Sequence, residues 1–149
     1  MLITGAAGFI GSNFINYIFY KGIYRIIALD NLSNCLDESS INECIREDDN
    51  FIFIKGSYGN EKLVKKILNQ YKITYVLNLA ATSFQPQTLG QPVHYVDNNV
   101  LNMTKFLQTC LEYNKIVVFI HFSTFLIREG VESLHSNNTE CITEYSVTK

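Results

Sequence analysis

The chain opens with MLITGAAGFIGS, residues 1–12, and this segment predicts how the remainder is arranged. A short apolar run gives way to Gly5, Gly8 and Gly11 at three-residue spacing, and an apolar-periodic segment follows. The pattern predicts a strand, a glycine turn and the start of a helix. Glycine suits a backbone that bends sharply, approaches a diphosphate or packs helix against strand. The N–H groups at the helix N-terminus would then bind the anion.

An acidic residue further along strengthens this interpretation. Nineteen residues beyond Gly11, the run over residues 25–29 ends in Asp30. A second strand there would deliver a carboxylate to the ribose hydroxyls of an adenosine, and the following turn would place Asn31 and Ser33 beside it. Because a 2′-phosphate would face this carboxylate and no arginine follows it, we expect NAD rather than NADP.

Strand-like and helix-like patterns alternate along the whole chain. Strands are predicted at residues 1–3, 25–30, 51–54, 75–81 and 116–122. Apolar helical stripes are predicted at Ile10, Phe14, Tyr17 and Ile18, at Leu63, Val64, Ile67, Leu68 and Tyr71, and at Val96, Val100, Met103, Leu107 and Cys110. Such alternation requires crossover helices and a parallel sheet. We therefore expect one α/β domain over residues 1–149, a Rossmann-type doubly wound parallel sheet of about five strands.

The composition excludes several classes of protein. A chain of 149 residues with 47% hydrophobic and 17% charged residues is typical of a globular domain. The net charge of −2 argues against a nucleic-acid partner. No apolar run reaches the roughly 18 residues of a membrane span, and the glycine turn leaves no room for a signal peptide, so we expect a cytoplasmic protein without a membrane partner. The cysteines form no CxxC pair, so no metal site is expected.

A candidate for proton transfer lies in YSVTK, residues 145–149. Tyr145 and Lys149 are four residues apart and would share one helix face. A lysine ammonium beside a phenol favours the phenolate and lowers a pKa that starts near about 10. The pairs Tyr17/Lys21 and Tyr58/Lys62 have the same spacing, so chance is an alternative explanation. The position after the fifth predicted strand favours a role at the binding crevice.

Several blocks of this sequence resemble the extended short-chain dehydrogenase/reductases, the NAD-dependent epimerase/dehydratase family. These blocks are TGAAGFIGS, DNLS at 30–33, NLAA at 78–81, Asn99-Val100, Ser123-Thr124 and YSVTK. Within that family, the layout over residues 30–35 and the order of blocks over residues 51–81 are most similar to the dTDP-glucose 4,6-dehydratases. The resemblance implies a nucleotide-sugar substrate that gives a hydride to NAD, with Thr124, Tyr145 and Lys149 as the catalytic residues. It also implies an NAD site formed by Gly5, Gly8, Phe9, Ile10, Gly11, Asp30, Asn31, Ser33, Ser57, Tyr58, Leu79, Ala80, Ala81 and Asn99.

Two departures from the family pattern leave the activity open. The dehydratases carry an Asp-Glu pair after the threonine, whereas Phe125 and Leu126 stand here and cannot transfer a proton. Family members also continue beyond the lysine into a substrate-binding part. The chain could therefore be the NAD-binding portion of a dehydratase or epimerase, truncated or degenerate. It could instead be an epimerase that uses only the three catalytic residues, or a non-catalytic dinucleotide-binding or interaction module, which would form a homodimer or otherwise self-associate through an exposed apolar patch.

Overall fold

The computed structural model describes residues 1–22, 25–33, 37–83, 91–124, 145 and 148–149. The chain divides into two compact units. The sheet unit comprises Met1–Ala80 and Lys105–Phe122, and the second unit comprises Ala81–Thr104 and Ser123–Lys149. Over the described ranges, no helix is long and apolar enough to cross a membrane.

The sheet unit is built on five parallel strands in the order β3-β2-β1-β4-β5. The strands are β1 (Leu2–Thr4), β2 (Ile26–Asp30), β3 (Phe51–Lys55), β4 (Tyr75–Asn78) and β5 (Val118–His121). The chain runs outward from β1 in one direction through β3 and then returns to the other side of β1 through β4 and β5. This order confirms the predicted doubly wound fold. It also places the turn after β1 at the switch point, where ligands bind in such sheets.

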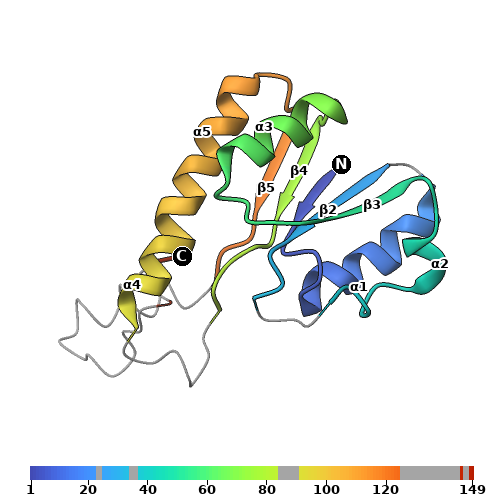
Figure 1. Cartoon of the computed structure of the whole chain (residues 1–149), viewed down its shortest axis with the longest axis horizontal. Helices are drawn as coiled ribbons and strands as arrows, with labels where there is room; N and C mark the ends of the chain where they lie inside the picture. Colours follow the sequence, from blue (N-terminus) through green and yellow to red (C-terminus); the bar gives the residue numbers. More distant parts are fainter. Residues whose placement is uncertain (23–24, 34–36, 84–90, 125–144, 146–147) are drawn as a thin grey trace. The chain divides into compact units, whose positions relative to one another are not determined.

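The helices of the sheet unit flank these strands (Figure 1). Helices α1 and α2 lie beside β2 and β3, whereas α3 and α5 lie beside β4 and β5. Their bounds are α1 (Phe9–Ile18), α2 (Glu43–Arg46), α3 (Glu61–Gln70) and α5 (Met103–Tyr113), with a short 3-10 turn η1 (Phe19–Lys21) after α1. In the second unit, α4 (Pro92–Tyr95) leads into the π-helical segment η3 (Val96–Asn102).

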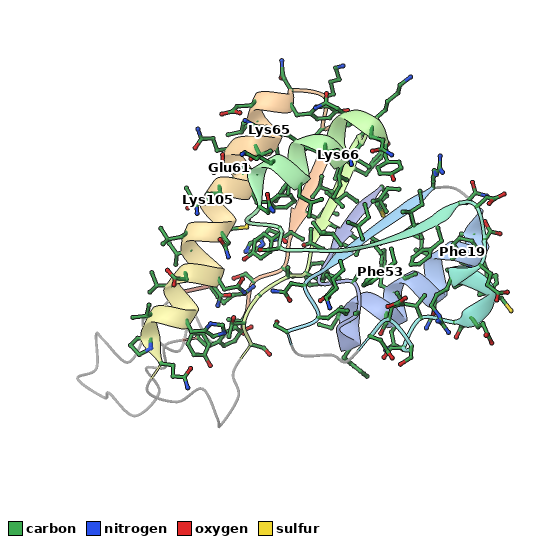
Figure 2. The ribbon with its side chains drawn as sticks, viewed as in Figure 1. Phe19, Phe53, Glu61, Lys65, Lys66 and Lys105 are labelled. Carbon is green, nitrogen blue, oxygen red and sulfur yellow. The ribbon has the colours of Figure 1, made fainter. Side chains whose placement is uncertain are left out.

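A buried apolar cluster joins α1 to one face of the sheet. Ile15 of α1 packs in this cluster with Ile3 and Leu77, which are register partners on β1 and β4. Phe19 and Phe53, labelled in Figure 2, pack against its margin. The glycine turn is therefore anchored at both ends, by a buried strand before it and a packed helix after it.

An ion pair links α3 to α5 within the sheet unit. The Lys65 ammonium lies 2.8 Å from the Glu112 carboxylate, and Figure 2 shows Lys65 and Glu61 where α3 runs beside α5. The bond to Glu112 raises the pKa of Lys65, and the bond to Lys65 lowers the pKa of Glu112. Both side chains are half exposed, so solvent and salt screen the pair and its contribution to stability is small.

The predicted stripe of α1 is partly wrong. Ile10 and Tyr17 were expected on the buried face, but they are 56% and 66% exposed. The buried positions are Gly11, Ser12 and Ile15. The physical reason is that the helix approaches the turn through Gly11, whose missing side chain permits contact with backbone atoms. The stripe of α3 is confirmed at its centre, where Val64, Ile67 and Leu68 are buried.

The predicted stripe of the long helix is also wrong in part. Val96, Val100 and Leu107 are exposed, whereas the buried residues are Tyr95, Asn99, Phe106, Thr109 and Cys110, of which only Cys110 was predicted. The helix begins at Pro92 instead of Val96, and the wide π-helical turns of η3 change the phase of the pattern. Burial raises the pKa of the Cys110 thiol to about 12, which keeps the thiol protonated near neutral pH.

Candidate dinucleotide site

The turn between β1 and α1 depends on two glycines for its geometry. Gly5 has a φ of +66°, and a Cβ there would lie 2.7 Å from the backbone nitrogen of Ala80. At Gly11, a Cβ would lie 2.2 Å from the Gly5 carbonyl oxygen. No residue with a side chain fits either position without displacing backbone atoms. The result is a tight loop that brings the end of β1, the segment after β4 and the first turn of α1 together.

The N-terminus of α1 presents backbone N–H groups that the helix itself does not use. Gly8 is the N-cap residue, and no side chain caps the helix there. The first intrahelical donor is the Ser12 N–H, bonded to the Gly8 carbonyl at 2.9 Å, so the N–H groups of Phe9, Ile10 and Gly11 precede it. The first turn contains no acidic residue. An anion such as a diphosphate suits this end of the helix.

Asp30 ends β2, and its carboxylate is held against the glycine turn. One oxygen accepts the Ala7 N–H at 3.0 Å, and the other accepts the Leu32 N–H at 2.8 Å. Each carboxylate oxygen can accept a further hydrogen bond. The carboxylate can therefore hold the turn and still receive hydroxyl groups of a ligand.

A row of polar side chains lies at the ends of three neighbouring strands. The Thr4 hydroxyl donates to the Asn78 side-chain oxygen, and the Asn78 side-chain nitrogen lies 2.9 Å from Nδ1 of His121. The Ala80 N–H also contacts the Thr4 hydroxyl at 3.4 Å. These residues were not predicted as part of the site. A polar residue at the end of an apolar strand is visible in the sequence, and Thr4, Asn78 and His121 each have this position. The structure shows that they are partners in the sheet register.

The other predicted cofactor residues of the sheet unit differ in exposure. Phe9 is 86% exposed on the first turn of α1. Asn31 and Ser33 are exposed, and the Asn31 side chain accepts the Ser33 N–H at 3.0 Å. Ser57 is half-buried, and its hydroxyl accepts the Gly59 N–H at 3.1 Å. Tyr58 lies in the core, where its ring packs edge-on against Phe106 and burial raises the pKa of its phenol.

Leu79 follows β4 directly, and its N–H donates to the Thr4 carbonyl at 3.1 Å. The strand was expected to continue to Ala81 but ends at Asn78, so Ala80 lies in the connection that passes Gly5. Ala81 belongs to the second unit. Close backbone approach at Gly5, rather than strand pairing, fixes the position of Ala80.

The second unit contains Asn99 and the three predicted catalytic residues. Thr124, Tyr145 and Lys149 are each half-buried. Burial lowers the pKa of the Lys149 ammonium, and the Ser123 hydroxyl donates to the Lys149 carbonyl at 3.4 Å. The Asn99 side chain is 8% exposed and bonds to Thr82 through both of its polar atoms. Phe125 and Leu126 lie outside the described residues.

The strand order, the glycine turn and the acid at the end of β2 define the architecture of dinucleotide-binding α/β proteins. A sequence model of the GDP-mannose 4,6 dehydratase family matches residues 2–125. The chain belongs to this family.

Individual relatives include both dehydratases and epimerases. The dTDP-D-glucose 4,6-dehydratase of Dictyostelium discoideum is 36% identical over 125 residues, which are 83% of this chain and 28% of the relative. The structure of dTDP-glucose 4,6-dehydratase from Bacillus anthracis in complex with NAD superposes with a TM-score of 0.73 at 28% identity, over 85% of this chain and 37% of that one. The structure of UDP-glucose 4-epimerase from Thermotoga maritima with UDP-glucose superposes with a TM-score of 0.70 at 29% identity, over 83% of this chain and 37% of that one. The chain therefore spans about a third of these proteins.

Proposed function

We propose that this chain is the NAD-binding part of a nucleotide-sugar dehydratase or epimerase. The observation that carries the proposal is the 3.0 Å hydrogen bond from the Ala7 N–H to the Asp30 carboxylate. It brings the acid suited to the adenosine ribose against the loop suited to the diphosphate. The NAD complex of the Bacillus anthracis dehydratase supports the choice of cofactor.

The residues of the sheet unit would divide the binding of NAD among them. The N–H groups of Phe9, Ile10 and Gly11 would bind the diphosphate, because they lie at the positive end of the α1 dipole. Asp30 would accept the ribose hydroxyls through the lone pairs that Ala7 and Leu32 leave free. A 2′-phosphate would face the same carboxylate, so NAD is favoured over NADP.

The second unit would supply the groups that act on a sugar. Bound NAD provides a hydride acceptor. Tyr145 would remove the proton of the sugar hydroxyl, Thr124 would bind the sugar oxygen, and Lys149 would hold the nicotinamide ribose. Phe125 and Leu126 carry no group that can transfer a proton, which favours hydride exchange without elimination of water by an Asp-Glu pair.

Calorimetric titration with NAD and NADP tests the cofactor assignment. We expect NAD to bind more tightly than NADP. Asp30→Ala should weaken NAD binding by about 10- to 100-fold, because hydrogen bonds to a charged group contribute about 1.5–3 kcal/mol. Asp37→Ala is a matched control, since the Asp37 carboxylate also accepts the N–H two residues on, from Ser39 at 2.8 Å, but is not bonded to the glycine turn. Absence of binding by both cofactors at millimolar concentration would refute the proposal.

A second candidate function is that of an interaction module. Strand β5 is at the edge of the sheet, and Val118, Ile120 and the following Phe122 are all exposed. An edge strand with alternating exposed apolar residues favours association with another chain. This candidate predicts association without cofactor-dependent chemistry.

A further inference from the structure

The turn that carries Tyr145 and Lys149 is closed by Thr148. The Thr148 N–H donates to the Tyr145 carbonyl at 3.2 Å, and the Thr148 hydroxyl contacts the same carbonyl at 3.3 Å. Both donors of one residue therefore bind the backbone of Tyr145. The hydroxyl has lone pairs left with which to accept a further hydrogen bond.

The Asn99 side chain donates to that hydroxyl. Its Nδ2 lies 3.2 Å from Thr148 Oγ1 and 3.0 Å from the Thr82 carbonyl, while its Oδ1 accepts the Thr82 N–H at 2.7 Å. Both N–H bonds of the amide are thus used, and the side chain is buried. A buried amide with all its donors satisfied is rigid, because rotation would leave polar groups without partners. Asn99 therefore offers Thr148 a fixed point of attachment.

The π-helical segment η3 carries two adjacent asparagines that bond to Thr82. The adjacent residues Asn98 and Asn99 both reach Thr82, since Asn98 Nδ2 donates to the Thr82 hydroxyl at 3.1 Å. Both asparagines belong to the π-helical segment, and such segments are frequent at functional sites. Thr82 thus bonds to both asparagines through its backbone and its hydroxyl. The remaining N–H of the Asn99 amide is directed at Thr148.

From these contacts we infer that Thr148 is a positioning residue. Its hydroxyl bonds to the rigid Asn99 side chain and to the Tyr145 carbonyl, and so holds the backbone of Tyr145 and Lys149 in place. Lys149 follows Thr148 directly, and its carbonyl is held separately by the Ser123 hydroxyl at 3.4 Å. With the backbone held on both sides, the Lys149 ammonium is kept in a half-buried place, where burial lowers its pKa. The inference rests on the proposed function, because it assigns a further residue to the same catalytic group.

The test measures the pKa of Lys149 in the cofactor-free protein, by NMR titration of protein with ¹³C-labelled lysine. The Lys149 signal is assigned with Lys149→Arg. Thr148→Val removes the hydroxyl at nearly constant volume, and we expect the pKa of Lys149 to rise toward its ordinary value. Thr148→Ser restores a hydroxyl and should restore the lowered pKa. Thr104→Val is the matched control, because it removes a hydroxyl of the same unit that donates to the Val100 carbonyl at 2.8 Å, and it should leave the pKa of Lys149 unchanged.

An unchanged Lys149 pKa in folded Thr148→Val would overturn the inference, as would an equal shift in Thr104→Val. If Thr148→Val does not fold, hydrogen exchange of the Asn99 side-chain amide in the unsubstituted protein tests the contact between Asn99 and Thr148. One proton bound to Thr148 and one bound to the Thr82 carbonyl should both exchange slowly. Rapid exchange of either one contradicts the contact. Neither measurement requires NAD, so failure of the positioning contact and failure of cofactor binding are distinguished by separate experiments.

Discussion

At the scale of single residues, Gly5 and Gly22 distinguish two reasons for which a position requires glycine: a left-handed backbone and close contact with other backbone atoms. Gly5 and Gly22 both have a φ of +66°, so a side chain would strain the backbone equally at either position. Only Gly5 also lies against backbone atoms, since among the described residues no atom is within 4 Å of a Cβ at Gly22. The comparison isolates the contribution of close packing beneath the glycine turn.

The two alanine substitutions should therefore differ in stability. Gly22→Ala should cost about 1–2 kcal/mol of unfolding free energy from the left-handed backbone alone. Gly5→Ala should cost about 1–3 kcal/mol more, because the new methyl group overlaps the backbone of Ala80. Chemical denaturation followed by circular dichroism measures both values. Equal losses for the two variants would show that the loop relaxes freely and that close approach does not determine its shape.

The sequence predicted some of these residues and missed others for a physical reason. Gly5, Gly11 and Asp30 were recognisable because the spacing along the chain reflects a local strand–turn–helix unit and the strand that follows it. The contact between Asn99 and Thr148 joins residues 49 positions apart, and nothing in either neighbourhood indicates the other. Polar residues bonded across loops depend on the tertiary structure, which periodicity does not encode.

At the scale of elements, the helices show where hydrophobic periodicity fails. The stripe of α3 is confirmed at its centre, where Val64, Ile67 and Leu68 of an ordinary α-helix are buried. In the long helix, π-helical geometry over Val96–Asn102 and a buried asparagine shift the packed face. Val96, Val100 and Leu107 are left exposed. A pattern of period 3.6 presupposes regular helix, and η3 is not regular.

Strand β5 gives the prediction that belongs to this scale. Sedimentation velocity over increasing protein concentration should reveal association through the exposed edge, and Ile120→Lys should weaken it, because a charge on an edge strand opposes pairing. Tyr20→Lys is the control, since Tyr20 is similarly exposed but lies on η1. A monomer at every concentration, or equal effects of both substitutions, would contradict the proposal that the chain associates through strand β5.

At the scale of the whole molecule, the predicted fold is confirmed: five parallel strands form one doubly wound sheet. The alternation of apolar runs was sufficient for this, because right-handed crossovers leave few arrangements of five parallel strands. The strand ends were less predictable, since β4 stops at Asn78 where the chain turns past the glycine loop. The proposed cofactor groups lie mainly in the sheet unit, whereas Thr124, Tyr145 and Lys149 lie in the second unit. Cofactor binding can thus be tested independently of catalysis.

The most direct test of the dinucleotide site is an NMR titration of ¹⁵N-labelled protein with NAD. The account predicts that the backbone amide signals of Ala7, Phe9, Ile10 and Gly11 shift in a saturable manner, while those of Lys65 and Lys66 on α3 do not. The same additions to Asp30→Ala should produce much weaker shifts at equal concentration. Saturable shifts confined to residues away from the glycine turn, or shifts at the turn that Asp30→Ala leaves unaltered, would contradict the assignment.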